Sequence, residues 1–242
     1  MDAHIVDTKN EQNTSPASGD AKEQTKSASL TEWLVEAIVC GDFPAGSKIS
    51  EPELAKKYSV SRGPLREAMM RVESLGLVER IPHVGARVIT LSLQQLCDIY
   101  AVRESLEGMA ARLACENMSD AEIESLTTLL DKHSKHIQEV DGASYFHQQG
   151  DFDFHYRIIK ASGNRKLISL LCDELYHQLR MYRYQSPRSH SRPVNALKEH
   201  IHILEAIRER DGELAEMLMR RHIQRSRQLI ELQLKDEKEK AS

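Results

Sequence analysis

Hydrophobic residues recur at helical spacing along most of this 242-residue chain. The first clear pattern starts at Ser29, which is followed three residues later by Glu32, and apolar side chains then repeat until Gly41. A serine and a glutamate at this spacing form a capping box, and a glycine commonly ends a helix. The pattern predicts a helix from Ser29 to Gly41. Residues 1–28 are mostly small or polar, which predicts a disordered leader.

Two shorter helical patterns and a hairpin follow. The helices start at Ser50 and at Ser61, and the second of them ends at Gly76. Residues 77–90 then contain two short runs rich in valine and isoleucine around a Pro-His-Val-Gly turn, which predicts a two-stranded hairpin. Three helices followed by a β wing predict a winged helix-turn-helix domain over residues 29–91.

The remainder of the chain contains helical patterns separated by short polar breaks, and no convincing strand. The predicted helices span residues 92–117, 119–140, 145–161, 164–184, 192–210 and 212–234. About six helices in succession predict an all-α bundle over residues 92–234, so the fold class is mainly α. Residues 235–242 are expected to form a solvated, charged tail.

Composition narrows the class of protein further. The chain has 33 Lys and Arg against 37 Asp and Glu, a formal net charge of -4, so a nucleic acid would have to be recognised by a local patch. The four cysteines form no C-x-x-C pair, and no run approaches the roughly 18 apolar residues of a membrane helix. We therefore expect a cytoplasmic protein with reduced thiols and no membrane partner.

A local excess of positive charge surrounds the helix predicted to start at Ser61. Between residues 56 and 71 the chain has five basic residues and one acidic residue, which are Lys56, Lys57, Arg62, Arg66, Glu67 and Arg71. The first turn of a helix in the major groove reaches base edges, and an arginine there can donate to guanine O6 and N7. We predict that Arg62 reads bases and that Arg66, one turn later, faces the same groove.

Four more residues complete the expected DNA-binding surface. Ser61 and Gly63 can present backbone N–H groups to a phosphate at the positive end of the helix dipole. His83 and Gly85 lie at the tip of the predicted wing, where a small polar turn can enter the minor groove or touch phosphate. The alternative is a solvated helix whose arginines serve only solubility, but the neighbouring helix, turn and wing favour double-stranded DNA as the partner.

The second half of the chain holds candidate metal ligands. Asp151 and His155 are four residues apart, so they share one helix face. His200 and His222 each lie eleven residues from Asp211, so an antiparallel helix pair that turns there would bring them to the same height. One carboxylate and three imidazoles suit a divalent ion such as Zn, Ni, Fe or Mn. Spacing alone leaves ordinary surface histidines as the alternative, since the chain has 11 of them.

The N-terminal part of the chain resembles a known family. The segments "DFPAGSKISEPELAKKYSVSRGPLREA" and "GLVERIPHVGARV" resemble the DNA-binding domain of the GntR family of bacterial transcription regulators, over about residues 30–89. The resemblance implies that the residues matching Arg62 and Arg66 contact the operator. It implies supporting contacts from Ser61, Gly63, His83 and Gly85.

The C-terminal part, over about residues 92–232, looks like the FCD effector domain of the FadR subfamily of these regulators. The similarity is carried by "IYAVRESLEGMAARLA", "GDFDFHYRIIKASGN" and "EHIHILEAIRERDGELAEMLMRRHI". The resemblance implies a bound metal ion whose ligands are Asp151, His155, His200 and His222. It also implies that Arg103 holds the carboxylate of an effector, although an ion pair of Arg103 with Glu104 or Glu107 is the structural alternative.

These observations predict a ligand-responsive transcription regulator, a repressor, that binds a palindromic operator as a homodimer. The expected effector is a small organic acid, with a tricarboxylate such as 2-methylcitrate as the specific candidate. One alternative is a metal-sensing regulator with the ion itself as effector. A metal-dependent hydrolase is the other, but the chain has no H-E-x-x-H motif and the DNA-binding half would be unexplained.

Overall fold

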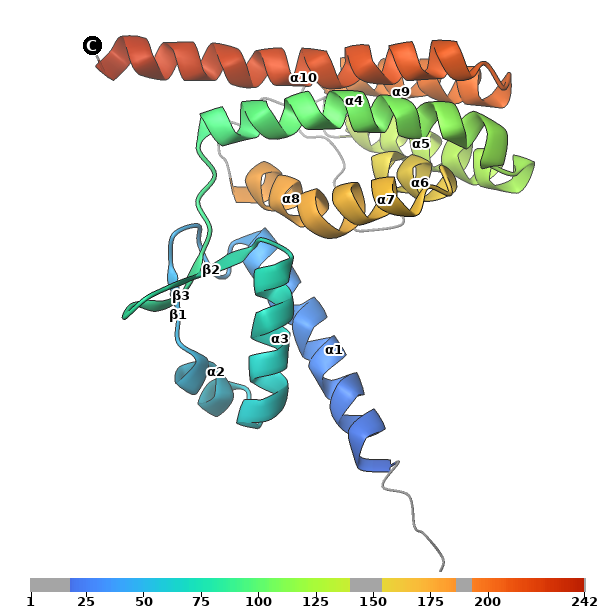
Figure 1. Cartoon of the computed structure of the whole chain (residues 1–242). Helices are drawn as coiled ribbons and strands as arrows, with labels where there is room; N and C mark the ends of the chain where they lie inside the picture. The colour runs from blue at the N-terminus through green and yellow to red at the C-terminus, as the bar shows by residue number, and fades with distance from the viewer. Residues whose placement is uncertain (1–17, 140–153, 186–192, 242) are drawn as a thin grey trace, which may run out of the picture.

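The computed structural model describes residues 18–139, 154–185 and 193–241. The N-terminal domain contains three helices and a small sheet (Figure 1). Its elements are α1 (Ser18–Cys40), β1 (Lys48–Ile49), α2 (Glu51–Lys57), α3 (Arg62–Ser74), β2 (Val78–Ile81) and β3 (Gly85–Val88). This is the predicted winged helix-turn-helix.

The core of this domain lies between α1 and α3. Leu34 and Ile38 of α1 are fully buried, and they belong to one cluster with Leu65 and Met69 of α3. Each pair is four residues apart, so each helix presents one apolar face to the other. This packing leaves the opposite face of α3 in solvent.

The structure differs from the sequence prediction at three places in this domain. The helix α1 already begins at Ser18, so residues 18–28 of the expected leader are helical and Ser29 lies inside the helix rather than at its cap. Ser50 and Ser61 are N-cap residues, but neither side chain makes a capping hydrogen bond. The sheet has three strands in the order β1-β3-β2 instead of two, because the short β1 pairs with β3.

Gly76 ends α3 and directs the chain into the wing. Its φ of 65° is in the left-handed region, the amide of Gly76 donates to Glu73 O, and the amide of Leu77 donates to Val72 O. These two bonds form a Schellman motif, whose turn position favours glycine. The packing of the buried Leu77 and Val72 in one cluster completes it.

The C-terminal domain is an all-α bundle, as predicted. Its helices are α4 (Leu93–Asn117), α5 (Asp120–Glu139), α6 (Phe154–Ala161), α7 (Arg165–Ile168), α8 (Tyr176–Gln185), α9 (Pro193–Arg208) and α10 (Gly212–Ala241), with the π-helix η2 (Ser169–Leu175) between α7 and α8. Figure 1 shows α4 and α10 running antiparallel side by side, with α6, α7 and α8 beneath them. The predicted helix over residues 164–184 therefore contains a π-helical turn.

The last helix is longer than the sequence analysis expected. The helix α10 continues to Ala241, so residues 235–241 of the expected tail are helical. These residues are mostly lysine and glutamate, which have high helix propensity, and they follow a helix that is already formed. No helix among the described residues is long and apolar enough to span a membrane.

The two domains meet where α8 packs against α1. Arg180 of α8 donates from Nη1 and Nη2 to the two carboxylate oxygens of Glu36 on α1, at 2.8 Å and 3.1 Å. Met181, the next residue, is 2% exposed and belongs to the hydrophobic cluster of the DNA-binding domain. The helix α8 is therefore part of both domains.

Replacing Gly76 with alanine tests the turn after α3. We expect Gly76→Ala to lower the free energy of unfolding by about 1 to 2 kcal/mol, because alanine is strained at a left-handed φ. A Cβ at this position would also lie 2.2 Å from Gln178 Nε2, the end of a side chain that can move. Denaturant unfolding in a Gln178→Ala background separates the two effects, and an alanine variant as stable as its parent in that background would contradict the strain.

Candidate DNA-reading surface and metal centre

The exposed side of α3 carries the residues predicted to read DNA. Ser61, Arg62 and Gly63 are all exposed at the start of the helix, while Pro64 and Leu65 directly after them are buried. Arg66 is exposed one turn later. The buried residues hold the first turn of α3 on the domain while its arginines remain in solvent.

The wing presents its tip beside this helix. His83 has a φ of 63° and Gly85 a φ of 99°, and both residues are exposed. Arg80 of β2 forms ion pairs with Glu51 of α2 at 3.1 Å and with Glu73 of α3 at 2.9 Å. These ion pairs join the wing to both helices of the helix-turn-helix.

A surface hollow between α3 and the wing is lined by more positive charge than the sequence analysis assigned. Arg62 and Arg66 line it together with Lys48 of β1, Arg80 and Gly85. Lys48 precedes α3 in the chain, and only the pairing of β1 with β3 brings it to the wing, whereas Arg80 lies in β2, the strand that directly follows α3. The arrangement places basic side chains from three elements around one groove, as contact with a phosphate backbone requires.

Three histidines converge inside the helical domain. His155 of α6, His200 of α9 and His222 of α10 are at most 7% exposed, and their nearest ring nitrogens lie within 4.8 Å of one another. The Nε2 atom of His200 is 3.2 Å from Nε2 of His155 and 3.2 Å from Nε2 of His222. Phe154 stacks on the His200 ring, with 4.2 Å between ring centroids. The structure thus brings together three of the four predicted metal ligands.

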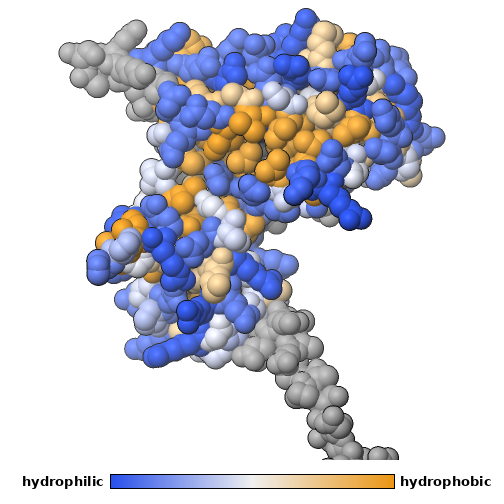
Figure 2. Space-filling view, in the orientation of Figure 1, coloured by the Kyte–Doolittle hydropathy of each residue, from blue (hydrophilic) through white to orange (hydrophobic). Residues whose placement is uncertain are grey.

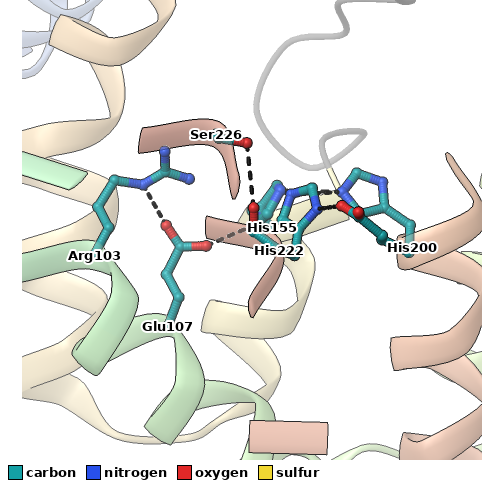
Figure 3. Close-up of polar contacts among 7 residues, drawn as sticks. Arg103, Glu107, His155, His200, His222 and Ser226 are labelled. Carbon is teal, nitrogen blue, oxygen red and sulfur yellow. Dashed lines mark hydrogen bonds and ion pairs between the residues drawn. The ribbon is translucent and has the colours of Figure 1, made fainter. Parts of the chain in front are cut away.

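Two glutamates orient these rings from behind. Glu107 Oε2 lies 2.6 Å from Nδ1 of His155, and Glu199 Oε2 lies 2.7 Å from Nδ1 of His222. A carboxylate accepts, so Nδ1 carries the proton of each ring and Nε2 keeps its lone pair. The Nε2 atoms of His155 and His222 both face Nε2 of His200 (Figure 3), so three ring nitrogens converge on one point.

The spacing of these nitrogens fits a divalent ion. Ligand nitrogens about 2.0 to 2.1 Å from a zinc ion are about 3.3 Å apart in a tetrahedral site. The two 3.2 Å separations agree with that value. Histidines backed by carboxylates are also the usual surroundings of a metal, because the carboxylate fixes the tautomer and increases the basicity of the ligand. Asp151, the fourth predicted ligand, lies outside the described residues.

Arg103 is buried beside this cluster. Its Nε donates to Glu107 Oε1. The ion pair with Glu107, which the sequence analysis gave as the alternative to effector binding by Arg103, is therefore formed. Burial opposes ionisation of Glu107, but the charge of Arg103 and the contact with His155 outweigh it and hold the pKa of Glu107 below the usual range. The Nη1 atom of Arg103 is buried and has no hydrogen-bond partner among the described residues. The ion pair therefore leaves one donor of the guanidinium unused.

Glu107 and Glu199 were missed by the sequence analysis as parts of this centre. Glu199 directly precedes His200, and Glu107 lies one turn after Arg103, so both positions were visible. Nothing in the spacing distinguishes them from the many other glutamates of the chain, because the contacts join helices that are far apart in sequence.

A winged helix-turn-helix followed by an all-α domain is an arrangement typical of DNA-binding transcription regulators. The family comparisons agree with this assignment. Residues 26–88 match the bacterial regulatory proteins of the gntR family, and residues 98–225 match the FCD domain. The chain belongs to the GntR family of transcription regulators and carries a C-terminal FCD domain.

Several curated relatives align with most of this chain. The HTH-type regulator BphR of Paraburkholderia xenovorans is 32% identical over 202 residues, covering 78% of each chain. The Nta operon transcriptional regulator of Aminobacter aminovorans is 31% identical over 76% of this chain and 84% of its own length. The repressor RspR of Escherichia coli is 27% identical over 74% and 77%. The relatives are regulators and not enzymes, so the hydrolase alternative is unsupported.

Solved structures show the same fold. Escherichia coli McbR/YncC has a TM-score of 0.65 at 21% identity and covers 86% of this chain and 98% of its own. A GntR regulator from Rhodococcus has a TM-score of 0.66 at 18% identity, covering 85% and 97%. At this level of identity the similarity concerns the fold alone.

A pair of histidine variants tests the metal centre. We expect His200→Ala to lose the bound ion, because it removes one of three converging nitrogens. His202→Ala should keep it, since His202 is exposed on the same helix two residues further on. Metal analysis of the dialysed proteins measures both, and full metal content in His200→Ala would rule out this centre. Glu107→Gln should weaken binding about 10- to 100-fold.

Proposed function

We propose that this protein is a transcriptional repressor that binds a palindromic operator through α3 and the wing. The observation that carries the proposal is the exposed first turn of α3, where Ser61, Arg62 and Gly63 face solvent and Arg66 follows one turn later. Arg62 donates to guanine in the major groove, and Arg66 faces the same groove. Ser61 and Gly63 donate backbone N–H groups to phosphate, and the wing tip contacts the adjacent minor groove.

The arginine at the start of α3 provides the direct test. We expect Arg62→Ala to lower operator affinity by about 1 to 3 kcal/mol for each half-site, because a bidentate guanine contact is lost. Arg165→Ala is the matched control, since Arg165 is equally exposed near the start of α7 in the other domain. Operator titration at one fixed salt concentration measures the affinity of the wild type, Arg62→Ala and Arg165→Ala. An Arg62→Ala variant that binds as tightly as the control would exclude base reading by this residue.

The protein acts as a homodimer in this proposal. One reading helix contacts only a few base pairs, so a specific operator needs two copies related by a two-fold axis. Figure 2 shows hydrophobic residues gathered on the helical domain over α4 and α7. On α4 this surface contains the exposed Val102 and Met109 together with the half-buried Leu106 and Leu113, a set we term the α4 strip. The spacing puts all four on one helix face, and we propose that two copies associate through it.

A charge placed in the α4 strip tests the dimer. We expect Met109→Glu to give a monomer in sedimentation experiments, because a carboxylate would be buried at the interface. Met217→Glu is the control, since Met109 and Met217 are each 41% exposed but Met217 of α10 lies among charged residues. Both variants should fold, as neither residue is in the core. A dimeric Met109→Glu protein would exclude the strip as the interface.

The helical domain senses the regulatory ligand in this proposal. His155, His200 and His222 hold a divalent ion, Zn, Ni, Fe or Mn, with Asp151 as the fourth ligand, and the ion supplies a Lewis-acidic position for a carboxylate. Arg103 holds a second carboxylate of the same small organic acid, for which a tricarboxylate such as 2-methylcitrate is the candidate. The buried Nη1 donor of Arg103 supports this role.

A second candidate function is a metal sensor with the ion itself as effector. The cavity lined by Arg103, Glu107 and His155 has a volume of only about 20 Å³, which is too small for an organic acid unless the structure changes, and this favours the ion at the histidines as the effector. The two candidates differ in what changes operator affinity. An organic acid that changes it while the metal stays bound favours the acid, whereas a change that follows metal removal alone favours the ion.

A further inference from the structure

A small cavity lies beside His155 and is lined in part by α8, the helix through which the helical domain contacts the DNA-binding domain. Its polar wall is formed by Arg103 and Glu107 of α4 and His155 of α6, and the opposite wall by Tyr176, Leu179 and Arg180 of α8. With about 20 Å³ of free volume it has room for roughly one water molecule. A carboxylate ligand can enter only if a wall moves.

The wall formed by α8 begins directly after a π-helical turn. The π-helix η2 directly precedes Tyr176, and π-helical turns occur mostly in functional regions, where they interrupt the regular hydrogen-bond pattern. The other wall is held together by the ion pair of Arg103 with Glu107 and by the contact of Glu107 with His155. On these grounds we take α8 as the wall that moves when a ligand enters.

Two buried guanidinium groups line this small space. Arg103 is 3% exposed and Arg180 is 5% exposed, and each has a buried nitrogen without a hydrogen-bond partner among the described residues, Nη1 of Arg103 and Nε of Arg180. Buried donors are rarely left unpaired, since each costs free energy. Arg103 is paired with Glu107 and Arg180 with Glu36, so each guanidinium already has a carboxylate partner. An anion that enters the cavity would therefore use the unpaired nitrogens or replace one of these carboxylates.

Arg180 is also the residue that joins the helical domain to the DNA-binding domain. Both of its terminal nitrogens donate to Glu36 of α1, and α1 packs directly on the reading helix α3. A guanidinium has one fixed plane, so Nη1 and Nη2 of Arg180 cannot turn toward a ligand in the cavity without giving up the bidentate contact with Glu36.

We propose that Arg180 is a second anion-binding residue of this cavity and that Glu36 competes with the ligand carboxylate for it. Binding of the acid moves α8, takes Arg180 from Glu36 and changes the position of α1 and α3 relative to the helical domain. This inference rests on the proposed function, since it names how ligand binding reaches the operator. It requires the two states of α8 to differ in affinity for the acid.

The test uses the full-length, metal-loaded protein with citrate and succinate as probes at matched ionic strength. Glu36→Gln keeps the size of the side chain and removes its charge, and Glu32→Gln, exposed one turn earlier on α1, is the matched control. Operator titration measures affinity with and without each acid, and calorimetry measures binding of the acid itself. Circular dichroism checks that the variants are folded.

We expect either acid to change the operator affinity of the wild type and of Glu32→Gln by about 5- to 150-fold. Glu36→Gln should have the acid-bound operator affinity without any acid, should respond less than about 2-fold, and should bind the acid more tightly, because linkage is reciprocal. Arg180→Gln should bind the acid more weakly than the wild type.

Three outcomes would overturn the inference. A Glu36→Gln protein that responds to acid as the wild type does would exclude the competition. An Arg180→Gln protein with unchanged acid affinity would exclude anion binding by Arg180. A wild type that binds neither acid would exclude the anion site. None of these results affects the Arg62→Ala experiment, which tests the DNA-binding function separately.

Discussion

The buried carboxylate of Glu107 is the interaction on which the interior of the helical domain depends. It accepts from Arg103 on its own helix and lies 2.6 Å from Nδ1 of His155 on α6. A buried charge is tolerated only when it is paired and hydrogen-bonded, so the three side chains form one unit. Removing any one of them leaves a buried group without its partner.

Glu107 contacts two different groups through its two oxygens. Its Oε2 fixes the tautomer of His155, so that Nε2 of His155 points toward the nitrogens of His200 and His222. Its Oε1 accepts from Nε of Arg103, while Nη1 of Arg103 takes no part in this ion pair. Glu107 thus contacts the histidine cluster and also lines the cavity that we propose as the anion site.

The DNA-reading surface depends on a different constraint. The start of α3 is anchored by the buried Pro64 and Leu65, and its end by the Schellman turn at Gly76. The ion pairs of Arg80 then fix the wing against α2 and α3. These contacts position the start of α3 beside the wing. The contact of α8 with α1 connects this part of the protein with the helical domain.

Much of this protein could be predicted from the sequence by itself. Helical periodicity and glycine stops depend on neighbours within one turn, so the winged helix, the succession of helices and the exposed Arg62 were all visible. The symmetric spacing of His200 and His222 about Asp211 also anticipated their approach, because a helix has a fixed rise per residue.

The tertiary structure decided what depends on contacts between distant segments. The third strand, the position of Lys48 beside the wing, and the contacts of Glu107 and Glu199 with the histidines all follow from pairing across elements. The position of Arg180 between the cavity and Glu36 does so too, since these two residues are 144 positions apart in the sequence. Local pattern carries no information about such contacts, because they are set by how whole helices pack.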